Sequence, residues 1–498
     1  MIQSKSEKDK KESVSSQTIK GTLWNYISRY SGKLLVFIST IILARLLSED
    51  DFGVAGYALV FMSFLEVLRP MGIGAALIFF PEKEENNETA FWLFIIIGFA
   101  LFTISWIFAP FVGTYFNDDR AIIVVRLISL SFPINALGSV QDSLLTKHLD
   151  FNLRFIPDFA RAVVKGLISI ALATAGFGAA SLVWGHLAGA AIAVVALWIV
   201  SPWRPSLKFS VKPAQLLLAY GVKIISIDLL SVVLNNLDYL IIGRYFSASM
   251  LGVYTIAFRL PEIIIKQFYS LAGQVFFPAY SKLKSKIETL KASFLLTVKY
   301  INLITIPIWI GLSFVSKPFV LVFLTAKWEE AIPLIPIISL SMILRAIGFN
   351  AGSIYKATGH PNIIIKIKII QLAATVPILW QATNQFGTLS AIAWGMVLSS
   401  VLELALNLYY IDKILGVRLS AIATATLPGM ASGGIMAATL GILTYFIQPL
   451  SSLSQLALMV VTGAFTYVLS VYILFPDIYI FLKDVFIKLL PAGYLSKS

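Results

Sequence analysis

The sequence contains no cysteine, and only three of its 498 residues are histidine. Disulfide bonds, thiolate catalysis and cysteine-bound metals are therefore excluded. His148, His186 and His360 are too few and too far apart in the sequence for a histidine metal site, so we expect no metal and no cofactor. Charged residues are scarce as well, at 13%.

Hydrophobic residues make up 58% of the chain, and the mean hydropathy is +0.84. A water-soluble globule of this size could not cover so much apolar surface, which indicates an all-α integral membrane protein. Apolar runs of about 20 residues, long enough to cross a bilayer as helices, occur fourteen times. They are 22–46, 52–80, 90–112, 121–146, 155–175, 178–202, 215–244, 251–278, 292–315, 331–357, 363–383, 386–411, 421–447 and 453–475.

The net charge of +13 raises the question of nucleic acid, and the positions of the basic residues answer it. With the N-terminus inside, the inside segments hold twenty Lys and Arg, whereas the outside connections hold three. This asymmetry is the positive-inside pattern of a membrane protein. It predicts no nucleic-acid partner and places the basic tail 1–21 and the tail 476–498 in the cytoplasm. The tail 1–21 is too polar for a signal peptide.

A short stretch of sequence recurs at an interval of 199 residues. ARLLSEDDFGV, from Ala44 to Val54, is echoed by GRYFSASMLGV, from Gly243 to Val253. Arg45, Ser48, Gly53, Val54 and Ala58 recur as Arg244, Ser247, Gly252, Val253 and Ala257. Because the interval corresponds to six spans, an even number, we expect two parallel six-helix lobes related by an axis along the membrane normal. Two similar turns arising by chance are the alternative.

The predicted lobes are 22–202 and 215–411, joined by a cytoplasmic linker, 203–214, and followed by two extra transmembrane helices within 421–475. At the repeated turn, Arg and Gly suggest local roles: the arginines can reach the membrane interface, and the glycines can relieve a tight turn. In the extra pair, the spacing of Gly429 and Gly433 permits close helix packing.

Ten charged residues fall at mid-membrane depth, where charges are costly and usually face a cavity. They are Lys33, Glu66, Arg69, Lys165, Lys223, Asp228, Arg259, Glu262, Lys266 and Arg345. Seven are basic and three acidic, and all but Lys165 and Arg345 come from the first two helices of each half. These helices are therefore predicted to line one shared cavity.

Arg259, Glu262 and Lys266 share one helix face next to Pro261, and Glu66 and Arg69 repeat the spacing beside Pro70. Any one acid could neutralise its neighbour as an internal pair. Pairing all three acids still leaves four bases, so the cavity predicts an anionic cargo such as a phosphate or pyrophosphate. No phosphate-binding loop of the GxxxxGK[ST] type occurs, and we expect a transporter rather than an enzyme.

The segment ILARLLSEDDFGVAGYALVFMSFLEVLRPMGIGAALI, Ile42 to Ile78, resembles the opening of Wzx-type polysaccharide flippases, the polysaccharide transporter branch of the MOP superfamily. That superfamily also holds MATE exporters and MurJ-type lipid II flippases. The chain departs from the pattern at Glu49, where relatives often have Pro, and at Pro70, where they often have an acidic residue. The second departure weakens the transfer of a cation-coupling acid to the second helix.

The resemblance implies alternating-access flipping of an undecaprenyl-pyrophosphate-linked oligosaccharide across the bacterial cytoplasmic membrane, for O-antigen (lipopolysaccharide), exopolysaccharide or teichuronic-type polysaccharide. It implies that basic residues of the first, second and eighth helices contact the pyrophosphate, here Arg29 or Lys33, Arg69 and Arg259. Together with the cavity bases Lys266, Lys223 and Arg345, these are the predicted substrate-binding residues, and Glu66, Asp228 and Glu262 are possible coupling acids. Expected partners are the lipid-linked oligosaccharide, membrane lipids and possible polysaccharide polymerases and glycosyltransferases.

Three alternatives remain. A MurJ-type lipid II flippase would differ in cargo, and a MATE-like exporter of cations would require acids in its cavity. A membrane glycosyltransferase or polymerase would usually present a large outside loop with catalytic acids, whereas the longest outside connection, 316–330, has only Glu329 and Glu330.

Overall fold

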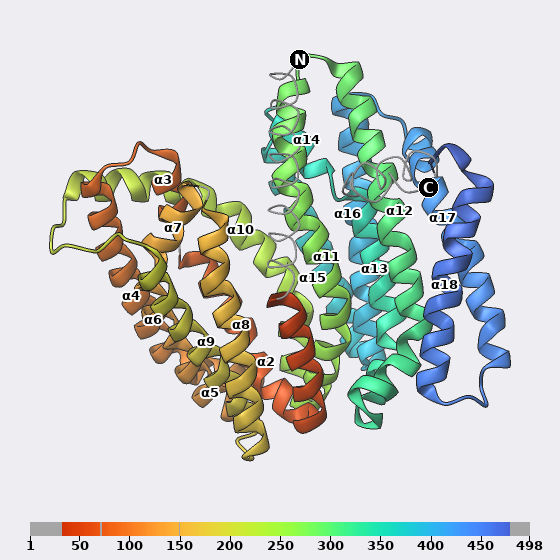
Figure 1. Ribbon diagram of the computed structural model, residues 1–498, viewed down its shortest axis with the longest axis horizontal. Coiled ribbons are helices and arrows are strands. Elements are labelled where there is room, and N and C mark those ends of the chain that lie inside the picture. Colours follow the sequence, from red (N-terminus) through yellow and green to blue (C-terminus); the bar gives the residue numbers. More distant parts are fainter. Residues whose placement is uncertain (1–31, 70–71, 149, 479–498) are drawn as a thin grey trace, which may run out of the picture.

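The computed structural model describes residues 32–69, 72–148 and 150–478. Its helices form two bundles that stand side by side and converge at one end (Figure 1). The first bundle contains α3–α9, and the second contains α10–α16 with α17 and α18 at its far edge. The helical segment 32–46 and α2 lie where the bundles meet, and α2 packs against both α10 and α11. We refer to the first bundle together with the segment 32–46 and α2 as the N lobe, and to the second bundle as the C lobe.

Helices occupy the predicted spans wherever the structure describes them; of the first span, 22–46, only residues 32–46 are described. They are α2 Glu49–Leu68, α3 Ile73–Phe79, α4 Glu84–Phe116, α5 Arg120–Ser129, α6 Ser131–Ala136, α7 Ser139–Lys147, α8 Phe151–Thr174, α9 Ala179–Val200, α10 Val211–Tyr245, α11 Ala248–Leu283, α12 Ile287–Phe319, α13 Leu334–Gly348, α14 Ala351–Ala357, α15 Asn362–Phe386, α16 Leu389–Leu415, α17 Leu419–Phe446 and α18 Ser452–Leu474, with short π and 3₁₀ turns at Val320–Leu324 and Ala326–Ala331. The all-α membrane architecture predicted from composition is confirmed.

Three predicted spans are broken rather than continuous. Span 52–80 is divided between α2 and α3, and Gly72 before α3 has a φ of 64°, a left-handed conformation that suits glycine. Span 121–146 becomes α5, α6 and α7, and span 331–357 becomes α13 and α14. Among the described residues, nine helical segments are long and apolar enough to cross a membrane, and two of them combine helices across a break, α2 with α3 and α13 with α14. The number becomes ten if the bent pair α5–α6 and α7 is one span. The charge-bearing helices α8, α10 and α11 are not among the nine.

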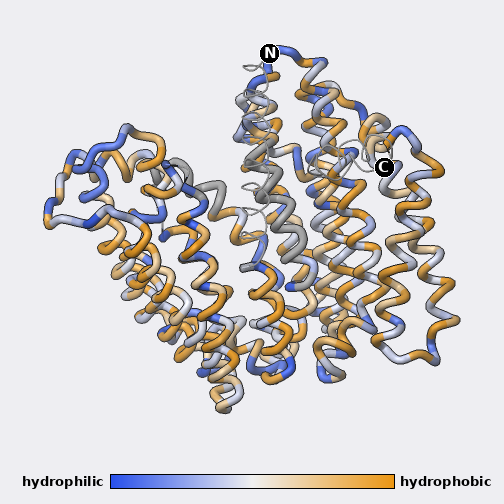
Figure 2. Tube along the Cα trace, viewed as in Figure 1, coloured by the Kyte–Doolittle hydropathy of each residue, from blue (hydrophilic) through white to orange (hydrophobic). Residues whose placement is uncertain are grey.

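Hydrophobic residues predominate along the helices of both lobes, and hydrophilic residues gather towards the ends of the helices (Figure 2). Phe111 and Ile199, for example, are 66% and 76% exposed. Exposed apolar surface of this kind is stable in the hydrocarbon core of a bilayer, because no water is present there to make its exposure unfavourable.

The glycines of the repeated motif join the two lobes. A Cβ at Gly53 in α2 would lie 1.7 Å from the carbonyl oxygen of Ala248, and a Cβ at Gly252 in α11 would lie 1.9 Å from that of Glu49. These contacts are reciprocal, because Glu49 and Ala248 are themselves 199 residues apart. The predicted role of the glycines in a tight turn is wrong: both lie inside helices, and neither has a positive φ. They are small because the backbones of the two lobes touch.

The repeated arginines also bridge the lobes instead of only reaching the membrane interface. Arg45 donates hydrogen bonds to the carbonyl oxygens of Val322 and Phe323, the latter at 2.7 Å, just beyond α12. Arg244 donates to the carbonyl oxygens of Thr114 at 3.0 Å and Tyr115 at 2.7 Å, at the end of α4. Each arginine therefore satisfies carbonyl groups left unpaired at a helix C-terminus of the opposite lobe.

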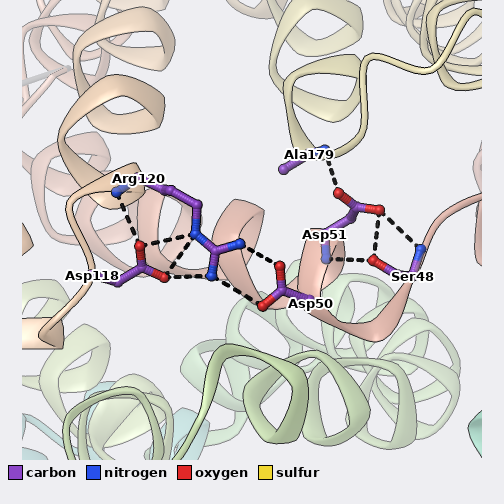
Figure 3. A network of polar contacts seen from close by, with 6 residues as sticks. All are labelled: Ser48, Asp50, Asp51, Asp118, Arg120 and Ala179. Atoms are coloured by element: carbon purple, nitrogen blue, oxygen red, sulfur yellow. Dashed lines mark hydrogen bonds and ion pairs between the residues drawn. The ribbon is translucent and has the colours of Figure 1, made fainter.

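The repeated serines are helix N-caps. The hydroxyl of Ser48 accepts from the amide of Asp51 at 3.1 Å, and that of Ser247 accepts from the amide of Met250 at 3.2 Å. Figure 3 shows that Asp51 also accepts from the amide of Ala179, at 2.9 Å, which ties the start of α9 to α2. We call the end of the molecule that carries these contacts the joined end.

Helices α17 and α18 pack against α12 on the far edge of the C lobe (Figure 1). A Cβ at Gly429 would lie 2.9 Å from the carbonyl oxygen of Asn302, and one at Gly433 would lie 2.8 Å from Ile310. The close packing predicted from the spacing of these two glycines is confirmed.

Candidate functional site

A cavity of about 610 Å³ lies between the two lobes. Its walls come from α2, α10, α11, α13 and α16, so residues of both lobes line it. Three charged side chains face this space: Glu66 from α2, Arg259 from α11 and Arg345 from α13. Polar groups of α10, including Asn235 and Asn236, complete the lining. We call this space the central cavity.

Arg259 also lines a smaller cavity, of about 60 Å³, that extends into the N lobe. That space contains Lys165 of α8 and His186 of α9, next to the hydroxyls of Ser39 and Thr40. Lys165 is within electrostatic range of Arg259, Arg161 and Glu66. The two cavities together are lined by three cations, Lys165, Arg259 and Arg345, and one carboxylate. The described charge balance therefore favours an anion over a cation.

Helix α8 brings a polar stripe to this region. Arg154, Asp158, Arg161 and Lys165 are spaced by four, three and four residues and therefore share one helix face. Arg161 donates to the side-chain oxygen of Asn135 at 3.3 Å, and its Nε, which is buried, has no hydrogen-bond partner in the described part of the chain. A buried donor left open costs free energy unless a ligand or water satisfies it.

The predicted site residues divide into three groups. Arg259, Arg345 and Glu66 line the central cavity, as expected for a shared cavity between the halves. Arg69 lies within electrostatic range of Arg161 and His186 on the N-lobe side, and Lys33 is exposed and takes part in an interaction. The remaining predictions lie outside the residues, or the side chains, that the structure describes: Arg29, Lys223, Asp228, Glu262 and Lys266.

Sequence reasoning missed several groups of the polar interior. One is Asp238 of α10, which is fully buried and accepts from the hydroxyl of Tyr254 at 2.7 Å and the amide of Tyr239 at 3.0 Å. Arg161 was also missed, although the stripe on α8 was visible as a charge period in the sequence. Lys368 and Glu403 lie in spans that were read as apolar.

At the ends of the helices, ion pairs fix the turns. His148 contacts Glu82 at 2.8 Å, and the hydrogen bond from this imidazole, the larger of the lowering influences, holds the pKa of the Glu82 carboxyl below its usual value. Lys147 donates to the carbonyl oxygens of Leu77 at 2.7 Å and Phe80 at 2.8 Å, which caps α3. These contacts are remote from the joined end and hold the basic connections in place.

The sequence pattern of the polysaccharide biosynthesis protein family matches residues 42–333, which is more than half of the chain. The chain belongs to this family. Curated relatives agree with the assignment. The chain is 24% identical over 472 residues to the teichuronic acid biosynthesis protein TuaB of Bacillus subtilis, covering 91% of this chain and 95% of TuaB. It is 23% identical over 408 residues to the lipopolysaccharide biosynthesis protein WzxC of Escherichia coli, covering 80% and 82%.

Solved structures of transporters share the fold of this chain. An inward closed conformation of the lipid II flippase MurJ superposes with a TM-score of 0.72 at 14% identity, covering 92% of this chain and 99% of MurJ. An inward-facing multidrug resistance MATE transporter of the MOP superfamily gives a TM-score of 0.62, also at 14% identity, covering 79% and 96%. The predicted resemblance to the fold of MOP-superfamily transporters is confirmed.

Proposed function

We propose that this protein flips an undecaprenyl-pyrophosphate-linked oligosaccharide from the cytoplasmic to the outer leaflet of the bacterial inner membrane by alternating access. The observation that carries the proposal is the cavity between the lobes, where the described side chains present three cations against one carboxylate. A lipid-linked pyrophosphate is an anion of the right kind for such a space, because several bases from different helices can hold it by charge-assisted hydrogen bonds. A cationic cargo would be repelled there.

The orientation of the chain in the membrane gives the side from which cargo enters the cavity. The basic connections 147–154, 203–214 and 279–291 lie at the end opposite to the joined end (Figure 1), and positive charge favours the cytoplasmic side. The joined end is then on the outer face, both termini are cytoplasmic, and the lobes are held together on the outside. In this state the cavity loads cargo from the cytoplasm, and release outside requires the joined end to separate.

Relatives supply the class of product. TuaB and WzxC are named for teichuronic acid and lipopolysaccharide biosynthesis. By analogy, this chain exports a precursor of a cell-surface polysaccharide, upstream of a polymerase. The units that would move are the lobes 22–202 and 215–411.

Arg259 is the residue on which the proposal is tested. It lies about three helical turns into α11 from Ala248, and it lines both cavities. We expect Arg259→Ala to reduce flipping of the lipid-linked oligosaccharide in proteoliposomes at least ten-fold, because a buried charge contact of this kind is worth about 1.5–3 kcal/mol. Arg259→Lys should retain part of the activity if the contact is mainly electrostatic.

Two controls separate binding from folding. Arg418→Ala removes an exposed arginine at the start of α17, away from the cavity, and should leave flipping unchanged. Combining Arg259→Ala with Glu262→Gln should stay inactive; recovery in the double variant would mean that Arg259 serves only to neutralise Glu262. Wild-type flipping by Arg259→Ala would remove this residue from the substrate site.

A further inference from the structure

A second cavity, of about 300 Å³, lies in the C lobe beside the central cavity. The two spaces are neighbours, because Asn235 of α10 and Arg345 of α13 line both. The inner walls come from α15, with Lys368 and Gln371, and from α16, with Glu403 and Asn407. We call this space the C-lobe pocket. Its volume is at the lower end of the range typical of small-molecule sites, about 300–1,000 Å³.

Polar residues recur at helical spacing on α15 and α16, and all of those in the two stripes except Thr375 line the pocket. Lys368, Gln371 and Thr375 lie at i, i+3 and i+7 on α15, opposite Ser399, Glu403 and Asn407 at i, i+4 and i+8 on α16. Thr375 and Ser399 are hydrogen-bonded at 2.6 Å. Groups of this kind are costly within a membrane protein, so two facing polar stripes indicate a function.

Part of the hydrogen-bonding capacity is used inside the protein. The amide of Gln371 donates to Ser399 Oγ and to Glu403 Oε2, both at 3.2 Å. The hydroxyl of Tyr355 donates to the side-chain oxygen of Asn407 at 3.1 Å. These bonds fix the positions of Gln371, Glu403 and Asn407, so the pocket is built in advance of any ligand.

The remaining hydrogen-bonding groups face the C-lobe pocket. Arg345 donates through Nε to Ser400 Oγ at 3.2 Å, while no contact within the described chain engages its two terminal nitrogens. The Lys368 ammonium is within electrostatic range of Glu403 and Arg345, and no hydrogen bond holds it among the described residues. Asn235 is exposed to the cavity, and Glu403 has a second carboxylate oxygen available. The pocket thus offers both donors and acceptors to a ligand.

This mixture discriminates between ligand classes. A metal cation would be repelled by Arg345 and Lys368. A second phosphate would find Lys368 already within electrostatic range of the Glu403 carboxylate, so the pocket offers it less uncompensated positive charge than the central cavity does. A sugar hydroxyl both donates and accepts hydrogen bonds, so neighbouring hydroxyls can bridge an ammonium or guanidinium group and a carboxylate or amide. We infer that the C-lobe pocket binds a sugar unit of the lipid-linked oligosaccharide, the one next to the pyrophosphate.

The inference rests on the proposed function, because the pyrophosphate at Arg259 places the first sugar near Asn235 and Arg345. It adds a specificity site: the central cavity holds the charge common to all such lipids, and the C-lobe pocket reads the glycan. Loss of a binding group in the C-lobe pocket should therefore change the preference of the protein between lipids with and without sugar. It should not change the binding of pyrophosphate itself.

The test measures binding by the purified full-length protein labelled at a single introduced cysteine, Ser451→Cys, which is specific because the native chain has none. The probes are inorganic pyrophosphate, sugar-free undecaprenyl pyrophosphate, and pyrophosphate-linked glycolipids extracted from cells that make them. We expect the wild type to bind the glycolipids more tightly than the sugar-free lipid. Lys368→Met and Asn235→Leu should each reduce that ratio about 3- to 10-fold, which corresponds to one or two hydrogen bonds.

Gln385→Leu is the matched control, an exposed amide on the same helix as Lys368 at the end away from the pocket. Asn235 is exposed, so its variant should fold normally even if Lys368→Met does not. A wild type without preference for the glycolipids, or folded variants that keep the full ratio, would overturn the sugar site. Failure of Arg259→Ala to weaken pyrophosphate binding would instead count against the proposed function, because the sugar ratio does not depend on that contact.

Discussion

The residues repeated at an interval of 199 have the same structural roles in both halves of the chain. Arg45 and Arg244 cap carbonyl groups of the opposite lobe, and Ser48 and Ser247 begin α2 and α11 as N-caps. Ala58 and Ala257 are both fully buried. The sequence identities at an interval of 199 therefore reflect equal structural environments, which a pair of unrelated turns would not share.

Asp118 offers a measurable example at the same scale. Partial burial alone would raise the pKa of this carboxyl, but hydrogen bonds from Arg120, at 2.8 Å and 3.0 Å, hold it below the usual value of 3.8 (Figure 3). Arg120 also contacts Asp50 and so ties α2 to the turn after α4. A carboxyl with a lowered pKa stabilises the folded state above the pKa of the unfolded chain, and this contribution is lost as the pH falls through the folded-state pKa.

We therefore expect Asp118→Asn to destabilise the purified protein at pH 7 by about 0.5–1 kcal/mol, since Arg120 is half exposed. Thermal unfolding in detergent measures the effect. The difference from wild type should shrink as the pH falls below 3.8. Asp412→Asn, at an exposed site near the end of α16, is the control. An unfolding difference that stayed constant with pH would argue against the ion pair as its cause.

Helices α2 and α11 form the element on which separation of the lobes depends. Their backbones touch at Gly53 and Gly252, where no side chain can be accommodated. Hydrogen bonds near this contact add to it: the Ser249 hydroxyl donates to Glu49 at 2.7 Å, and Trp328 donates to the carbonyl oxygen of Ala44 at 2.7 Å. Small residues that allow close backbone approach are typical of packed membrane helices.

Gly53→Ala should prevent this contact, because the new methyl group would overlap a backbone oxygen that cannot move independently of its helix. Thr255 lines the central cavity and the smaller cavity that contains Lys165. A single cysteine at Thr255 should then react several-fold faster with a membrane-impermeant thiol reagent applied from outside. Gly434→Ala is the matched control, since a Cβ there meets no atom within 4 Å. Unchanged labelling of Thr255→Cys in the Gly53→Ala background would show that the joined end does not seal the cavity.

Polar stripes on single helices were harder to read from sequence than the helices themselves. On α8 the charges recur at intervals of four, three and four residues, and this signal was present. On α15 and α16 the stripes consist largely of Gln, Thr, Ser and Asn, which a hydropathy count does not separate from an ordinary span. The criterion of a charged residue at mid-membrane depth therefore identified Arg259 and Arg345 but not Lys368 and Glu403.

The whole molecule was predictable in its outline because bilayer thickness dictates the length of an apolar run. The positions of the helices over the described residues, the small-residue packing of Gly429 and Gly433, and a cavity lined by Glu66 and Arg259 followed from the sequence. The helix breaks near Gly72 and between α13 and α14 did not, since hydropathy is continuous across them. The contact of Gly53 with Ala248 was also out of reach, because it joins residues from two lobes whose approach no local pattern encodes.

Orientation in the membrane is a prediction for the whole molecule. A cysteine at Ser451, in the turn between α17 and α18, should react with an impermeant reagent in intact cells, whereas one at Ser285, between α11 and α12, should react only after permeabilisation. The excess of basic residues in the connections on the Ser285 side is the physical reason. The opposite labelling pattern would place the joined end in the cytoplasm and reverse the proposed direction of loading.

The exchanged contacts at the joined end have the form of an isologous dimer interface. Gly53 touches Ala248 while Gly252 touches Glu49; Arg244 reaches the end of the third helix of the other half, α4, and Arg45 reaches the turn just beyond the third helix of the other half, α12. In a two-fold dimer, residue i of one subunit contacts j of the other and the reverse, so a half-length protein with one copy of this motif could build the same interface from two identical chains. Fusion of two such chains would allow the copies to diverge, and the divergence is visible: the acidic run Glu49-Asp50-Asp51 has become Ala248-Ser249-Met250 in the second half. Co-expressing the two lobes as separate chains should therefore reconstitute one protein, because what joins them is an association surface and not only the linker.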